Sequence, residues 1–198
     1  MNATAAMTTD QGSAPLPWWS LSLGLAATLA YLAFGAAPEG WVFDRAAIEQ
    51  GEWWRLLSAH WVHCDAAHAT WDIAALLLLG MLFEPRLKWR VPLVLLGASV
   101  AIDAWLWWGM PTLSYYCGLS GILNSLLVFG LLHWWLGERH LLLLATVGLA
   151  GLKIILEINA GQALLTRTAW PSVPAVHAVG YLWGLAWASV TLRRWRRS

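Results

Sequence analysis

Two segments of the sequence carry side chains that could act together as a nucleophile and a base. Ser120 lies within Gly118-Leu119-Ser120-Gly121, and His177 stands alone near the start of a later apolar segment. A serine hydroxyl is a weak nucleophile until a base accepts its proton, and histidine is the usual base because it exchanges protons near neutral pH. The pair therefore predicts acyl transfer or hydrolysis at Ser120, with His177 as general base.

A second pair, His68 and Asp72, stands four residues apart in a segment with helical character, so both side chains share one helix face. An acyl-transfer site needs donors for the developing oxyanion. We expect these donors to be the ring of His68 and the backbone N–H groups of Leu119 and Ser120. Asp72 cannot donate as a carboxylate, so it either holds His68 as imidazolium or is itself protonated in apolar surroundings. The simpler alternative is a His-Asp pair that only stabilises the helix.

The elements that position these residues belong to a chain too apolar for a soluble globule. It has 198 residues, of which 59% are hydrophobic and 12% charged, and a mean hydropathy of +0.57. Apolar segments of about 20 residues are long enough to cross a bilayer as helices. The predicted spans are 18–37, 66–83, 91–110, 118–136, 140–158 and 173–192. The sequence therefore predicts an all-α membrane protein, a bundle of six transmembrane helices.

We expect one catalytic domain over residues 18–192, between an N-terminal tail at 1–17 and a basic tail at 193–198. The 84–90 link holds three cations and one anion, and the 193–197 segment holds four cations. The positive-inside rule assigns both to the cytoplasm, with both termini. Ser120 and His177 then lie near the outer ends of their spans. The mixed acidic and aromatic segment 39–65 falls on the same side, either packed on the bundle or lying in the outer leaflet.

Small residues flank both proposed site residues and predict a close helix crossing. Small-residue faces let two membrane helices approach until their backbones touch. Such an approach would bring Ser120 and His177 together, although a glycine motif of this kind can also serve packing alone. The glycines are Gly118, Gly121, Gly180 and Gly184.

Taken in order along the chain, these residues resemble the rhomboid intramembrane serine proteases. The matching positions are Trp54-Arg55, His63, His68, Gly118-Leu119-Ser120-Gly121, and His177-Ala178-Val179-Gly180 with Gly184. The resemblance implies that Ser120 is the nucleophile, His177 the base and acid, and His68 an oxyanion donor. It implies a transmembrane-helix protein as substrate and no metal or organic cofactor.

The short chain and the context from Tyr116 to Gly121 are most similar to the rhombosortase branch of that family. This branch implies the bacterial inner membrane, with the active site toward the periplasm, and exported substrates that carry a C-terminal Gly-Gly sorting segment. Two positions depart from the family pattern. Asp72 stands where many rhomboids have Asn, and Asn124 stands where relatives often have an aromatic that supports the catalytic histidine. Support for His177 must therefore come from elsewhere.

Both cysteines, Cys64 and Cys117, lie on the predicted periplasmic side near proposed site residues. In an oxidising compartment they could form a disulfide, and two buried free thiols are the alternative. Lys153 and Glu157, four residues apart in one span, are interpreted as an internal ion pair.

Other function classes find less support in the sequence. A transporter would need more intramembrane charges than the chain offers, and a haem protein would use His68 and His177 as axial ligands. A metalloprotease is disfavoured because the chain contains no His-Glu-x-x-His. The net charge of +1 gives no basis for binding nucleic acid.

Overall fold

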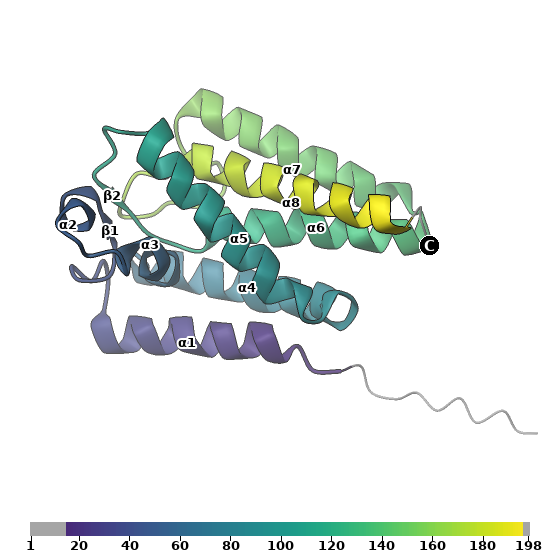
Figure 1. The fold of residues 1–198 in the computed structure, drawn as a ribbon, viewed down its shortest axis with the longest axis horizontal. Coiled ribbons are helices and arrows are strands. Elements are labelled where there is room, and N and C mark those ends of the chain that lie inside the picture. Colours follow the sequence, from purple (N-terminus) through teal and green to yellow (C-terminus); the bar gives the residue numbers. More distant parts are fainter. Residues whose placement is uncertain (1–14, 196–198) are drawn as a thin grey trace, which may run out of the picture.

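The computed structural model describes residues 15–195, and within them it is an all-α bundle of long helices (Figure 1). The long helices are α1 (Trp18–Phe34), α4 (Ala66–Leu87), α5 (Arg90–Ala104), α6 (Ser120–Glu138), α7 (Leu141–Ala160) and α8 (Pro174–Trp195). A π-helical turn, η2 (Trp105–Gly109), prolongs α5. Helices α4, α5 with η2, α6 and α7 are long and apolar enough to cross a membrane. The predicted all-α membrane bundle is confirmed.

Some helix ends differ from the predicted spans for local reasons. The first helix ends at Phe34 rather than at residue 37, because Gly35 adopts a φ of +74° that an α helix cannot continue. Helix α6 begins at Ser120 rather than at residue 118, since Gly118 has a φ of +114°. The nucleophile candidate is therefore the first residue of its helix.

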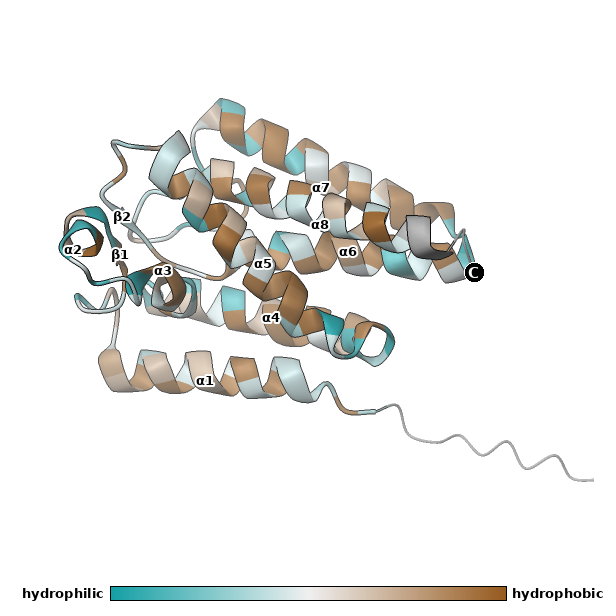
Figure 2. Ribbon diagram, in the orientation of Figure 1, coloured by the Kyte–Doolittle hydropathy of each residue, from teal (hydrophilic) through white to brown (hydrophobic). Residues whose placement is uncertain are grey.

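Helix α6 lies at the centre of the bundle and packs on α4, α5, α7 and most extensively on α8. Helix α1 lies at the edge, beside α4 (Figure 1). Brown, apolar residues run along the long helices, and the teal, hydrophilic ones gather at helix ends and on the short elements (Figure 2). Ser120 is the first residue of α6 and His177 lies in the first turn of α8, so both lie at the end of the bundle where these two helices begin.

The segment between α1 and α4 folds into short elements at that same end (Figure 1). They are β1 (Phe43–Asp44), α2 (Arg45–Glu49), α3 (Arg55–Ser58) and the 3-10 turn η1 (Ala59–Trp61). Strand β1 pairs antiparallel with β2 (Tyr115–Tyr116), just before the serine turn. Phe43 and Ile48 are buried in the core, so the segment packs on the bundle, as one of the two alternatives predicted. Trp53 and Trp54 remain exposed.

The opposite end carries the start of α1 and the end of α8 (Figure 1). There the buried carboxylate of Glu84 on α4 accepts the backbone N–H groups of Trp19 and Ser20, each at 2.8 Å. A carboxylate at a helix N-terminus satisfies free N–H groups and complements the helix dipole. Residues 1–14 of the predicted N-terminal tail and 196–198 of the basic tail lie outside the described residues.

Candidate active site

The turn before α6 sets the position of Ser120. Gly118 donates its N–H to the carbonyl of Ala59 at 2.9 Å, and Tyr116 Oη donates to the carbonyl of Gly118 at 3.1 Å. A Cβ at position 118 would overlap the ring of His68. Gly118 is therefore a turn residue with a left-handed backbone, and it does not lie on the helix-packing face on which the sequence placed it.

The glycines of α6 and α8 bring the two helices into backbone contact. A Cβ on Gly180 would overlap the carbonyl oxygen of Gly121, and one on Gly184 would lie 2.7 Å from the carbonyl oxygen of Ser125. Such proximity leaves room for hydrogen only. As a result Ser120 Oγ lies 3.0 Å from His177 Nε2, within hydrogen-bond distance.

The other ring nitrogen of His177 also has a partner, and sequence reasoning missed it. His177 Nδ1 lies 3.0 Å from Glu157 Oε2 on α7. The predicted ion pair is present as well, since Lys153 Nζ lies 2.7 Å from Glu157 Oε1. The signal available in the sequence was a carboxylate at membrane depth, for which pairing with one lysine on the same helix is not a sufficient reason. Asn124 does not support His177, because its amide donates to the carbonyl of Ser120 at 2.8 Å.

Asp72 Oδ2 lies among the groups that were expected to hold the oxyanion. It accepts the backbone N–H of Leu119 at 2.7 Å and of Ser120 at 3.1 Å. His68 Nε2 lies 3.2 Å from the same oxygen and His63 Nε2 lies 3.4 Å from it. The expected donors thus converge on one point, and in this structure a carboxylate oxygen of the protein occupies that point.

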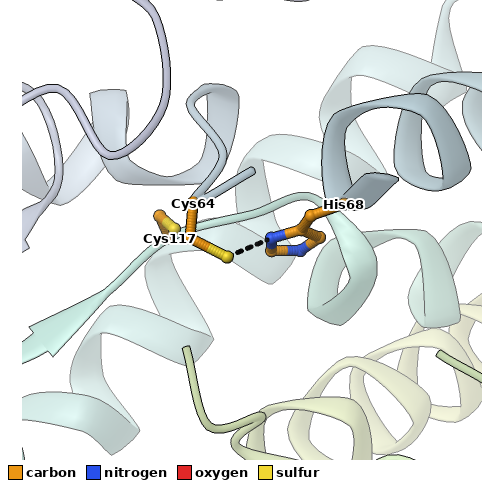
Figure 3. Close-up of side chains that lie close together, drawn as sticks. All are labelled: Cys64, His68 and Cys117. Carbon is orange, nitrogen blue, oxygen red and sulfur yellow. Dashed lines mark hydrogen bonds between the residues drawn. The ribbon is translucent and has the colours of Figure 1, made fainter. Parts of the chain in front are cut away.

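Both cysteines border the same site, beside His68 (Figure 3). Cys64 Sγ lies 3.2 Å from His68 Nδ1, and the ligand atoms of Cys64, His68 and Cys117 all lie within 4.8 Å of one another. A hydrogen bond from Cys117 lowers the pKa of the Cys64 thiol to about 5, and the same bond raises the pKa of Cys117. Both thiols are free in the structure, and the disulfide stays a prediction. Two sulfurs and an imidazole are also donors that zinc accepts, so the expectation of no metal stays a prediction too.

A cavity of about 1040 Å³ joins these groups, and both Ser120 and His177 line it. Apolar side chains from α4, η2 and α8 contribute to its wall, among them Trp71, Trp105 and Val179. A wall of this kind suits an apolar peptide segment better than a charged one. The nucleophile candidate is therefore reachable by a ligand.

Fold and site together define a multi-pass membrane protein with a serine-histidine pair at the end of a helical bundle. The Rhomboid domain family matches residues 50–194, which is most of the chain. The chain belongs to the rhomboid family, whose members are intramembrane serine proteases. The match begins directly after α2 and runs from α3 to the next-to-last residue of α8, so it includes neither α1 nor α2. A comparison with curated proteins finds no match.

Proposed function

We propose that this protein cuts a peptide bond in or beside the transmembrane helix of a membrane-anchored substrate, with Ser120 as nucleophile. The observation that carries the proposal is the 3.0 Å contact between Ser120 Oγ and His177 Nε2, on the wall of a cavity of about 1040 Å³. A nucleophile within hydrogen-bond distance of its base, and facing space for a substrate, meets the geometric requirement for acyl transfer.

In the proposed reaction, Ser120 Oγ bonds to the carbonyl carbon of the substrate while its proton passes to His177 Nε2. The carbonyl electrons move onto the oxygen, which the N–H groups of Leu119 and Ser120 and the ring of His68 stabilise. Because Asp72 Oδ2 holds these amides in the resting site, the substrate oxygen must replace it there. Collapse breaks the C–N bond, and His177 returns the proton to the leaving amine. Water then releases the acyl group.

The proposed substrates are exported bacterial proteins that end in a Gly-Gly segment, an apolar helix and a basic tail. The similarity of the segment from Tyr116 to Gly121 to the rhombosortase branch supports this choice. The chemistry supports it as well, since a helix must unwind to expose a carbonyl and each Gly weakens a helix by about 1 kcal/mol relative to Ala. We place the protein in the bacterial inner membrane with the active site toward the periplasm. The cation-rich 84–90 link supports this orientation, because it lies at the far end of α4 from His68.

The test uses the purified protein in proteoliposomes with a substrate that carries Gly-Gly, an apolar helix and a basic tail. We expect cleavage by the wild type, and less than about one part in 10⁴ of that rate for Ser120→Ala and His177→Ala, because the two residues act as a unit. A serine-directed fluorophosphonate should label the wild type and not Ser120→Ala. A matched substrate with Leu-Leu in place of Gly-Gly should be cut poorly. Equal cleavage of both substrates would leave the protease activity standing and refute the sorting assignment.

The haem and transport alternatives are not favoured. Both ring nitrogens of His177 have partners within 3.0 Å, and His68 Nδ1 faces Cys64 Sγ. Axial ligation of an iron would break one of these contacts at each histidine. The family match points to proteolysis instead.

A further inference from the structure

We infer that Glu157 is a positioning residue for the reaction, so that the site works as a Ser120-His177-Glu157 triad rather than as a serine-histidine pair. This inference rests on the proposed function. Ser120 Oγ lies 3.0 Å from Nε2 of the imidazole, and Glu157 Oε2 lies 3.0 Å from Nδ1. The three side chains come from α6, α8 and α7, and together they form a continuous chain of hydrogen-bonding atoms.

The carboxylate determines which nitrogen of the neutral ring can accept a proton. Neutral imidazole carries one N–H, and an ionised carboxylate can only accept a hydrogen bond. Glu157 Oε2 therefore keeps the proton on Nδ1, and the lone pair on Nε2 faces the hydroxyl of Ser120. When that hydroxyl proton moves to Nε2, the resulting imidazolium lies beside a negative charge. The carboxylate thus stabilises the charge that forms during attack, without taking up the proton itself.

The surroundings of Glu157 fix its two oxygens in different roles. Oε1 faces Lys153 Nζ at 2.7 Å and accepts the backbone N–H of Leu164 at 3.0 Å. Oε2 is left for His177. Glu157 lies in the last turn of α7 and has no exposed surface, whereas the side chain of Lys153, one turn earlier, is 35% exposed. An ordinary ion pair on the surface of one helix would not bury its carboxylate against a neighbouring helix.

The charged and titratable groups that face His177 are few. From α7 they are Glu157 and, behind it, Lys153. From α6 the neighbour is the Ser120 hydroxyl. His68 and Asp72 of α4 line the same cavity, but they contact each other and the serine turn rather than this ring. Among the described residues, Glu157 is therefore the only carboxylate in contact with the proposed base.

The experiment measures fluorophosphonate labelling rates against pH for the wild type, Glu157→Gln and Lys153→Met in the full chain. We expect Glu157→Gln to slow labelling by roughly 10²- to 10⁴-fold, the range of a general-base contribution. Its amide can donate to Nδ1 and so leave the proton on Nε2, where it blocks acceptance from serine. The pH profile of the labelling rate should also differ from that of the wild type, because the carboxylate that stabilises the imidazolium during attack is gone. Lys153→Met keeps the carboxylate, and we expect it to retain at least about one tenth of the wild-type rate.

Equal losses in Glu157→Gln and Lys153→Met, or a Gln variant with the wild-type rate and pH profile, would overturn the inference. The inference would also be overturned if Glu157→Gln slowed labelling only as much as its smaller folded fraction explains, with an unchanged pH profile. Glu157→Asp carries the test if the Gln variant fails to insert. The shorter side chain of Glu157→Asp keeps the negative charge but places it farther from Nδ1 of His177. We therefore expect a wild-type pH profile at a reduced labelling rate, and a wild-type rate would contradict the inference.

The controls separate this inference from the proposed function. If the wild type is labelled and Ser120→Ala is not, the protease assignment stands whatever Glu157 does. If the wild type itself is not labelled at Ser120, the proposed function fails first. Insertion and thermal unfolding are measured for every variant.

Discussion

The carboxylate of Asp72 and the backbone amide of Leu119 form one of the shortest polar contacts in the site, with Oδ2 2.7 Å from the nitrogen. The same oxygen also holds the N–H of Ser120 and faces His68. Asp72 thus has two opposing effects. It occupies the place of the oxyanion, and its charge favours the imidazolium form of His68, which is the stronger donor.

These two effects predict crossing pH profiles for Asp72→Asn. At acidic pH the imidazolium forms without help, so we expect the Asn variant to cleave at least as fast as the wild type, because no anion competes with the substrate oxygen. As the pH rises, the variant should lose His68 as a charged donor and fall below the wild type, by up to roughly 100-fold. Cleavage rates across pH for wild type, Asp72→Asn and Asp72→Ala test this. An Asn profile that follows the wild type at every pH would refute it.

The close crossing of α6 and α8 predicts that one added methyl group lowers both the stability of the protein and its labelling at Ser120. In Gly180→Ala the added Cβ would meet the carbonyl oxygen of Gly121, and overpacking of this kind costs about 1–3 kcal/mol. We expect a lower unfolding temperature and loss of most labelling at Ser120. Gly148→Ala on α7 is the matched control, because nothing lies within 4 Å of its added Cβ. Equal stability of the two variants would contradict the close contact.

In the reduced protein, the thiols of Cys64 and Cys117 should differ sharply in reactivity. Because the hydrogen bond from Cys117 lowers the pKa of Cys64 to about 5, Cys64 is a thiolate above that pH and loses its charge as the pH falls through it. We expect a small thiosulfonate reagent to modify Cys64 at a rate nearly constant above about pH 6. Cys117, whose pKa is raised, should react slowly until Cys64→Ser removes its partner. Mass spectrometry measures the modification of both cysteines at several pH values. If neither cysteine is modified until the protein is treated with a reductant, the two form a disulfide instead.

Orientation in the membrane gives a further prediction. A reporter fused after Arg197 should read as cytoplasmic and one inserted near Gln50 as periplasmic, because the cation-rich segments anchor the inner face. Alkaline phosphatase and a fluorescent protein, active on opposite sides, make the assay self-controlled. The reverse pattern would move Ser120 to the cytoplasmic side and contradict the proposed export substrates.

The sequence predicted the helical bundle and the family well, because spans of about 20 apolar residues and the serine motif are local patterns. It did not predict the role of Gly118, since a left-handed turn and a helix-packing glycine look alike in one dimension. Glu157 was missed for a different reason. Its pairing with Lys153 is a spacing of four along one helix, whereas its contact with His177 depends on how α7 packs against α8. Likewise, the pair of Asp72 and His68 was visible, but the convergence of the serine turn on Asp72 Oδ2 required the fold.

The backbone contact between Gly121 and Gly180 limits how the reactivity of this site can be adjusted over evolution. Where side chains separate two helices, substitutions of different size can adjust the spacing in small steps. At Gly121 and Gly180 only hydrogen atoms lie between the two backbones, so α6 and α8 are already as close as they can be. Any larger residue at these positions would push the helices apart. Adaptation toward faster or slower turnover must then act through residues that lie outside the crossing, on α4 and α7. Variation in natural relatives of this chain should therefore concentrate outside the crossing, while the two glycines stay fixed.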